Sequence, residues 1–187
     1  METLYDVFFS PAAAMRQIAA RRPVGQAVAA FFLSVLIPAA AVYFALQAAG
    51  FARFAPAIMV VPVMLRLAAW VVGSAVLSLI AEFFGGRGTA LGLFTAVGFA
   101  HLPGIFLVPL AVAAMLLPAG AAGVVFVVGA LAVGLWTLAL VTVAVDQAHG
   151  LGLAKAVLVL LTPFLLMAAA GLVFAAFVGV ALWPRLG

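Results

Sequence analysis

Apolar residues form five long runs along this chain, and the charged residues lie between these runs or near the chain ends. The first run covers 24–49 and contains no charged residue. At 1.5 Å per residue it would reach about 39 Å, more than the hydrocarbon core of a bilayer requires. The remaining spans are predicted at 63–84, 91–117, 124–145 and 156–183. The pattern predicts an all-α, polytopic membrane helical bundle with five transmembrane helices.

Prolines interrupt two of the apolar runs. The stretch 54–84 is too long for one straight span and contains Pro56 and Pro62, so we expect a short interfacial or broken piece before the second span. Pro103 and Pro109 each remove a hydrogen bond from the third span and predict a kink there. Neighbouring spans must then shield the carbonyl groups that the prolines leave free.

The only stretch of mixed polarity precedes the first span. Ser10-Pro11 combines an N-cap residue with proline at the first helical position, and it predicts a short helix over 11–21. A weakly amphipathic, basic helix suits the membrane surface, where it contacts anionic headgroups or a partner; the plainer alternative is a topology anchor. Its headgroup contacts would be Arg16, Arg21 and Arg22. We therefore separate a cytoplasmic segment, 1–23, from a membrane domain, 24–187.

Composition restricts the function. Of the residues, 70% are hydrophobic and 6% are charged, and the mean hydropathy is +1.47; soluble domains carry about 25% charged residues. The absence of cysteine excludes disulfides, thiolate metal sites and a cysteine nucleophile. The sequence therefore predicts no enzyme activity, no cofactor and no metal. A net charge of +4, spread over membrane edges, does not predict nucleic-acid binding.

The basic residues predict the orientation. With the N-terminus in the cytoplasm, five basic residues lie inside and three outside, in agreement with the positive-inside rule. The C-terminus then lies outside, where Trp183 and Arg185 mark a membrane interface. The inside set is Arg16, Arg21, Arg22, Arg87 and Lys155, and the outside set is Arg53, Arg66 and Arg185.

Ionisable residues gather near the cytoplasmic ends of spans two to four, and such groups at a membrane are functional candidates by default. His101 lies deepest, and it is interpreted either as a ligand or proton relay or as a partner for a carbonyl freed by a proline kink. Asp146 and His149 share a helix face if span four continues that far. The candidate cluster is Glu82, Arg87, His101, Asp146 and His149, in which Glu82 and Arg87 form a loop-stabilising pair or are separately solvated.

Small residues recur at four-residue spacing and predict close helix contacts, since lipid provides no hydrophobic drive for association. Whether these contacts lie within one bundle or in a homo-oligomer is left open. The pairs and triplet are Ser74 and Ser78, Ala130 and Gly134, and Gly171, Ala175 and Gly179.

Several motifs together resemble the Yip family of membrane proteins. In its third span the chain has glycine, an aromatic residue, three further residues and proline, with Gly98, Phe99 and Pro103 as the motif residues. The aromatic-Ser-Pro start at 9–11, the glycine-rich loop 85–89 and the Gly-Leu-x-x-Ala-Lys-Ala segment at 150–156 are similar to the bacterial branch. The resemblance implies a bacterial inner-membrane protein.

A Rab GTPase partner is not carried over from the eukaryotic members, because the chain lacks both their long N-terminal region and their Asp-Leu-x-Gly-Pro element. Two classes of function remain. One is a non-enzymatic protein that organises the membrane or binds lipids or other membrane proteins. The alternative is a small transporter, lipid translocator or channel that uses kinked helices with Arg66 and His101, in which a homo-oligomer supplies the pathway.

Overall fold

The structure is a computed structural model that describes residues 2–48 and 50–182. Within these residues five segments are long and apolar enough to cross a membrane, which confirms the predicted all-α, five-span fold. Two short helices, α1 and α2, precede them. The helices are α1 Glu2–Phe9, α2 Pro11–Arg21, α3 Val24–Ala48, α4 Ala55–Phe83, α5 Ala90–Ala100, the 3-10 helix η1 Leu102–Phe106, α6 Leu107–Met115, α7 Ala119–His149 and α8 Leu153–Leu182.

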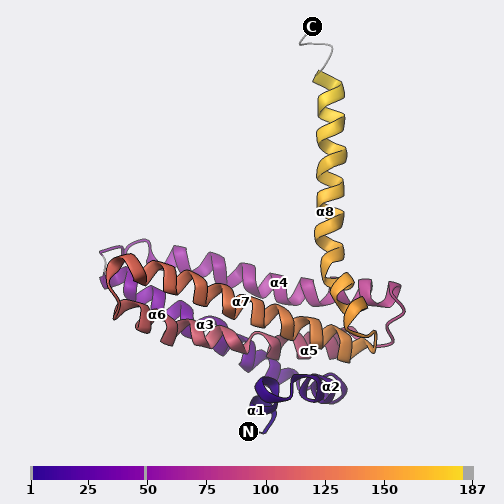
Figure 1. Cartoon of the computed structure of the whole chain (residues 1–187), viewed down its shortest axis with the longest axis horizontal. Helices are drawn as coiled ribbons and strands as arrows, with labels where there is room; N and C mark the ends of the chain where they lie inside the picture. Colours follow the sequence, from indigo (N-terminus) through magenta and orange to yellow (C-terminus); the bar gives the residue numbers. More distant parts are fainter. Residues whose placement is uncertain (1, 49, 183–187) are drawn as a thin grey trace.

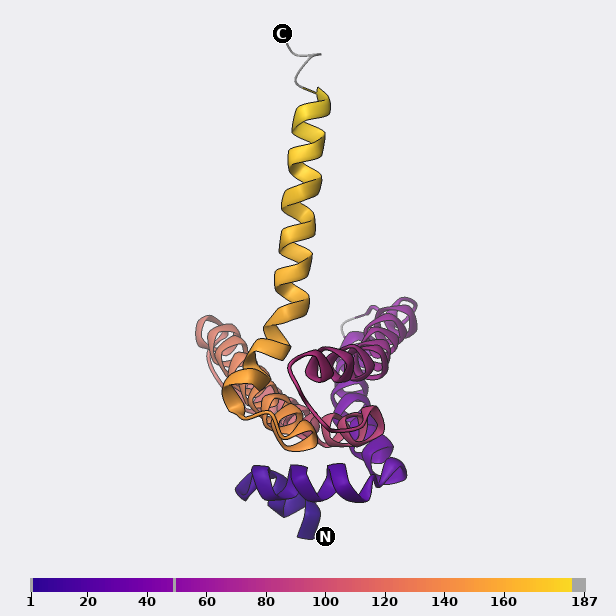
Figure 2. The ribbon, with the colours of Figure 1, turned by 90° about the vertical axis from the view of Figure 1, so that its right-hand side faces the viewer.

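Four spans lie side by side as a bundle: α3, α4, the broken span of α5, η1 and α6, and α7 (Figure 1). The short helices α1 and α2 cross one side of this bundle, and α2 contacts α5 and α7. Figure 2 looks along the bundle and shows α8 leaving it at a steep angle. The bundle is therefore a unit of four spans, from which the fifth projects.

The short helix predicted over 11–21 is present as α2, whereas α1 was not predicted. The apolar face of α2, with Met15 and Ile18, is buried in the protein. The ring of Phe8 in α1 packs edge-on against Phe106 and Trp136, with centroids 5.8 and 5.4 Å away. Trp136 lies about 20 Å before the end of α7 at 1.5 Å per residue. The N-terminal helices thus pack on the side of the bundle.

The second span differs from its prediction, because the expected break at Pro56–Pro62 is not present in α4. Pro56 lies in the first turn of this helix, where backbone N–H groups have no helical partner in any case. Pro62 lies inside the helix and has no backbone N–H, so the carbonyl of Ile58 loses its helical hydrogen bond. One unpaired carbonyl is not enough to end a helix of 29 residues.

The third span is broken where its prolines predicted. The helix α5 ends at Ala100, and η1 begins with Leu102 and Pro103 before α6 continues in the same direction. Pro109 causes no break, since it falls in the first turn of α6. At the other end of α5, the Thr89 hydroxyl accepts a 3.1 Å hydrogen bond from the Gly92 amide and caps the helix.

The polar loop predicted at 146–155 is shorter in the structure. Helix α7 continues to His149, and α8 begins at Leu153. Gly150 ends α7 because it adopts a left-handed conformation, φ 66°, that other residues rarely tolerate. The predicted interface markers Trp183 and Arg185 lie outside the described residues.

The outer part of α8 contacts no other part of the described chain (Figures 1 and 2). Every residue from 164 to 177 is exposed, including Phe164 at 65% and Phe177 at 72%. A helix that is apolar on all sides is stable only when hydrocarbon or protein surrounds it. Lipid or another protein must therefore cover this part of α8.

Candidate functional site

Polar side chains gather where α4 and α7 end and where α5 and α8 begin. We call this region the helix-end cluster; it comprises Glu82, the loop 85–89, Asp146, Gln147, His149 and Lys155. The structure thereby brings together four of the predicted candidates, Glu82, Arg87, Asp146 and His149, and leaves His101 elsewhere. Most contacts in the cluster join the end of one helix to another helix or to the loop 85–89.

Asp146 fixes the start of α8. One oxygen of its carboxylate accepts a 2.7 Å hydrogen bond from the Gly152 amide, and the other accepts a 2.8 Å bond from the Gln147 side chain. A carboxylate at the N-terminal end of a helix also stabilises the helix dipole. Asp146 is only 9% exposed. Both of its oxygens are thus engaged, one in holding α7 to the start of α8 and the other by the neighbouring Gln147 of α7.

His149 lies under the glycine-rich loop and is 3% exposed. Its Nε2 is 3.3 Å from the Ser78 hydroxyl of α4, and its carbonyl accepts a 3.1 Å hydrogen bond from the Arg87 amide. A Cβ at Gly86 would come within 3.0 Å of Nδ1, and one at Gly88 within 2.8 Å. Only glycine therefore lets the loop lie against the imidazole, a role that loop composition alone did not predict.

Other contacts complete the helix-end cluster. The carboxylate of Glu82 is exposed on the last turn of α4, near enough for its charge to act on His149. The Lys155 ammonium is 3.4 Å from the Phe84 carbonyl and links α8 to the end of α4. Within the described residues, Nδ1 of His149 has no hydrogen-bond partner.

A second feature of this end is a pocket of about 270 Å³ between α2, the loop 85–89 and α7. We call it the basic pocket, because three arginines line it: Arg16, Arg22 and Arg87. Arg16 is held by a 2.9 Å hydrogen bond from its Nε to the side-chain oxygen of Gln147. Arg21, the third predicted headgroup contact on α2, borders a separate hollow beside Gln17.

His101 belongs to an aromatic stack inside the bundle. Trp70 lies between Phe31 and Phe94, with ring centroids 4.3 and 4.2 Å away, and its indole N–H donates to the Phe94 carbonyl at 3.0 Å. The His101 ring meets Phe31 edge-on at 5.2 Å. Its Nδ1 is 2.7 Å from the Val97 carbonyl.

This hydrogen bond determines the state of the imidazole. A carbonyl oxygen only accepts, so Nδ1 of His101 carries the proton and donates it. Val97 lies one turn earlier, where the carbonyl groups at the end of α5 lack helical partners. Of the two interpretations of His101, this geometry corresponds to the one in which His101 pairs with a carbonyl at the helix break. The carbonyl that Pro103 itself frees is that of Phe99, however, and not that of Val97.

The motif residues of the third span lie at a close helix contact. A Cβ at Gly98 would come within 2.9 Å of the Trp70 ring and 3.0 Å of the Ala27 carbonyl. Gly92 and Gly104 similarly face the carbonyls of Ala19 and Ser34, which such a Cβ would meet at 2.9 and 3.0 Å. Phe99 and Pro103 are buried. Glycines six residues apart thus let this span lie directly against α2 and α3, a spacing that the sequence analysis missed.

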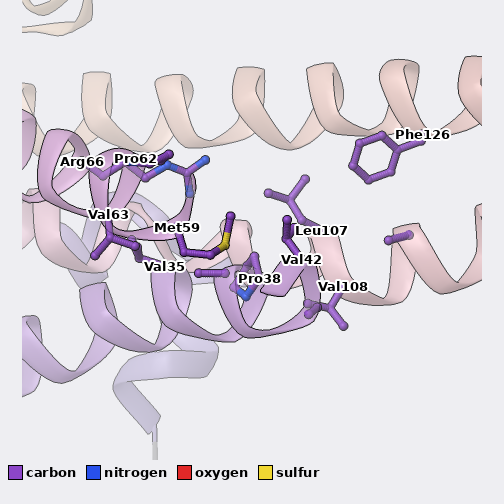
Figure 3. Close-up of a pocket in the computed structure, with 13 residues that line it drawn as sticks. Val35, Pro38, Val42, Met59, Pro62, Val63, Arg66, Leu107, Val108 and Phe126 are labelled. Carbon is purple, nitrogen blue, oxygen red and sulfur yellow. The ribbon is translucent and has the colours of Figure 1, made fainter. Parts of the chain in front are cut away.

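The remaining predicted residue, Arg66, lines an apolar pocket of about 200 Å³ between α3, α4 and α6. Figure 3 shows its guanidinium beside Pro62 and near Met59 of the same helix, with Val42 of α3 and Leu107 of α6 across the hollow. Arg66 is the single charged residue of the lining. His101 is not part of the lining, although Arg66 is near enough for an electrostatic interaction with it. No group of three described His, Asp or Glu side chains is arranged to hold a metal ion.

Comparison with protein families matches residues 5–183 to the family described as the Yip1 domain. No curated protein and no solved structure matches the chain. The matched range begins within α1 and covers all of α8. It therefore includes most of α1, the whole of α2, the helix-end cluster and the bundle.

Proposed function

The chain belongs to the Yip1 domain family, as its motifs predicted, and we propose that it is a non-enzymatic membrane protein that acts by binding lipids or other membrane proteins. One contrast carries this proposal. The buried polar side chains that could take part in chemistry are engaged in contacts at helix ends, either between helices or with the end of their own helix, whereas the apolar surface of the spans is extensive and exposed.

The hydrogen bonds of the polar groups support the first half of the contrast. Asp146 holds the start of α8, His149 faces Ser78, and His101 donates to the Val97 carbonyl. Nucleophilic catalysis needs a nucleophile, a base and a third group that orients the base, arranged around a reacting atom. In this cluster the contacts of the buried groups serve the packing of helix ends instead.

The exposed faces support the second half. Large apolar side chains are exposed along α4, α7 and α8, and those of α8 surround the helix from 164 to 177. Exposed apolar area on this scale suits a protein whose partners are lipid chains and other membrane helices. Binding experiments can therefore identify the partners, which would be lipids or membrane proteins.

The proposed location is a bacterial inner membrane, with the N-terminus in the cytoplasm and the C-terminus outside. The bacterial assignment follows from the resemblance of the loops to that branch. The orientation is supported by the helix-end cluster and the basic pocket, which gather Arg16, Arg22, Arg87 and Lys155 at one end of the bundle.

A second candidate function is transport or lipid translocation. The observation that favours it is the apolar pocket, where Arg66 lies at membrane depth between two proline-containing helices, α3 and α4. Charged residues inside the membrane often mark substrate pathways, and broken helices often line them.

Reconstitution separates the two candidates. Purified protein in liposomes is assayed for lipid scrambling and for proton and solute flux, as the native chain and as the variants H101A and R66M. The matched control is R53M, since Arg53 lies in the connection between α3 and α4. We expect flux at the level of protein-free liposomes and capture of membrane proteins in mild detergent. Flux that R66M or H101A abolishes, and that R53M preserves, would overturn the binding function.

A further inference from the structure

The basic pocket concentrates positive charge in a concave space. Arg16 and Arg22 approach it from α2, and Arg87 from the loop between α4 and α5. Repulsion among three guanidinium groups is unfavourable unless solvent or an anion compensates it. Arginine presents a planar set of donors that matches phosphate oxygens. The arrangement is therefore suited to an anionic ligand.

Two further features of the pocket favour negative charge. Thr89 and Gly92, at the N-terminus of α5, form part of its lining; the Gly92 amide is bonded to the Thr89 hydroxyl, so the contribution of this helix is the positive end of its dipole, which attracts anions. The Arg16 side chain is held in place, because its Nε donates to Gln147 and leaves the terminal nitrogens of the guanidinium for another partner. The Gln147 side chain also donates to Asp146, and the other carboxylate oxygen of Asp146 accepts from the Gly152 amide, so both oxygens of this carboxylate are engaged.

The backbone of Arg22 is an independent observation. Arg22 is the only non-glycine residue of the described chain with a positive φ, 53°, and it occupies the cap position that ends α2. Glycine adopts this conformation without strain and is the usual residue at such a cap. An arginine side chain is thus present where the backbone favours glycine, and that side chain lines the basic pocket. Strained residues of this kind cluster at ligand sites.

We propose that the basic pocket binds one phosphate group, contributed either by an anionic phospholipid headgroup or by free phosphate. Arg16, Arg22 and Arg87 neutralise its charge, and the N-terminus of α5 faces it. The inference rests on the proposed function, in which the protein binds lipids or other membrane proteins. It names one ligand, which would bind at the end of the bundle, where that end meets the membrane surface.

The test measures binding to purified protein in an uncharged detergent, where no membrane surface potential contributes. The probes are short-chain phosphatidylglycerol, short-chain phosphatidylcholine as the neutral lipid, and inorganic phosphate. The decisive pair is R22Q and R21Q, because these adjacent residues carry the same charge and only Arg22 lines the pocket. We expect R22Q to weaken binding about fivefold, the effect of one basic residue near an anionic headgroup, and R21Q to leave it within twofold.

Two further variants separate binding from folding. R22G removes the side chain and relieves the backbone, so we expect weaker binding with an unchanged or higher melting temperature. A20F fills the pocket from an exposed position of α2 without changing any charge, and A12F, also exposed on α2, is its control. We expect A20F to reduce binding and A12F to leave it unchanged.

The outcomes are distinct. Tighter binding of phosphatidylglycerol than of inorganic phosphate, lost in R22Q and A20F, identifies a lipid headgroup, and the reverse order with the same losses identifies free phosphate. Equal effects of R21Q and R22Q would overturn the pocket as a phosphate site, and so would the absence of binding of both phosphatidylglycerol and inorganic phosphate. Those results would leave the proposed function standing, because that function is tested separately by flux and by capture of membrane proteins.

Discussion

At the scale of single residues, the packing around Gly98 explains why this position has no side chain. Its backbone lies against the indole of Trp70 on one side and the backbone of α3 at Ala27 on the other. Neither neighbour moves easily, since Trp70 is stacked between Phe31 and Phe94 and hydrogen-bonded to the latter's carbonyl. The motif glycine thus allows the aromatic stack to form.

Substitution of Gly98 by alanine should therefore destabilise the bundle. Overpacking costs about 1–3 kcal/mol, and the gain in helix propensity offsets about 0.5–1 kcal/mol of it. We expect a net loss of about 1–2 kcal/mol in the free energy of unfolding, measured by denaturation in mixed micelles. The control is G73A in α4, where an added Cβ meets nothing within 4 Å. Equal effects of G98A and G73A would show that the close contact is not limiting.

The residue scale also shows what sequence patterns can and cannot predict. The motif identified Gly98 and Pro103, and the charge pattern identified Asp146 and His149 as candidates at a helix end. Neither pattern predicted that His101 would lie in an aromatic stack, apart from the other candidates. That arrangement depends on Phe31 and Trp70, which belong to other helices. Contacts between elements distant in sequence leave no local signal.

At the scale of elements, the junction between α7 and α8 depends on one carboxylate. Gly150 ends α7, and within three residues the chain begins α8 in a new direction (Figure 2). Asp146 spans this short turn by accepting from the Gly152 amide. Its charge acts on the positive end of α8, so both hydrogen bonding and the helix dipole fix the junction.

The variant D146N keeps one acceptor oxygen and removes the charge, so it should loosen the start of α8. We expect a loss of about 1–2 kcal/mol of local stability, since hydrogen bonds to charged groups exceed neutral ones by about that amount. Hydrogen exchange of the Gly152 amide, which donates to Asp146, and of the Ala156 amide, which donates to the Gly152 carbonyl, should then accelerate about tenfold. The control is T142V, which removes the hydrogen bond to the Leu138 carbonyl on an earlier turn of α7. Unchanged exchange in D146N would exclude the carboxylate as the clamp.

Helix boundaries were the least predictable property of the elements. The errors came from residues taken as ends: Pro62 for the start of α4, the glycine-containing stretch 118–123 for the start of α7, and Asp146 for the end of α7. The helices continue because each backbone hydrogen bond is worth more in an apolar surrounding than in water. Asp146 is accommodated in the helix by the Gly152 amide, which lies beyond the turn and gives no signal in the helix itself.

At the scale of the whole molecule, the ends of the bundle differ in charge. Arg16, Arg22 and Arg87 line the basic pocket, and Lys155 lies at the same end beside Phe84. Arg53 lies at the opposite end, in the connection between α3 and α4. The sequence predicted this separation from topology alone, because each span crosses the membrane once and successive loops therefore alternate between the two sides.

The orientation can be tested by labelling, because the chain contains no cysteine and each introduced thiol is unique. We expect a membrane-impermeant maleimide to label G120C, in the first turn of α7 next to its connection with α6, in intact bacterial cells. It should label K155C only after the membrane is opened. The reverse pattern would contradict the proposed orientation, and labelling of both positions in intact cells would indicate a mixed population.

The same assay tests whether charge determines the orientation. K155C already lowers the count of inside basic residues from five to four, and replacing both Arg21 and Arg22 by glutamine in that background lowers it to two, below the three outside. Since the bias of lysine and arginine sets orientation, and residues next to the first span weigh most, we expect partial labelling of K155C in intact cells. R53Q is the control, because it removes an outside charge and changes the bias in the K155C background from four against three to four against two. If the double variant labels like the native background, packing of α1 and α2 on the side of the bundle, and not their charge, holds the N-terminus inside.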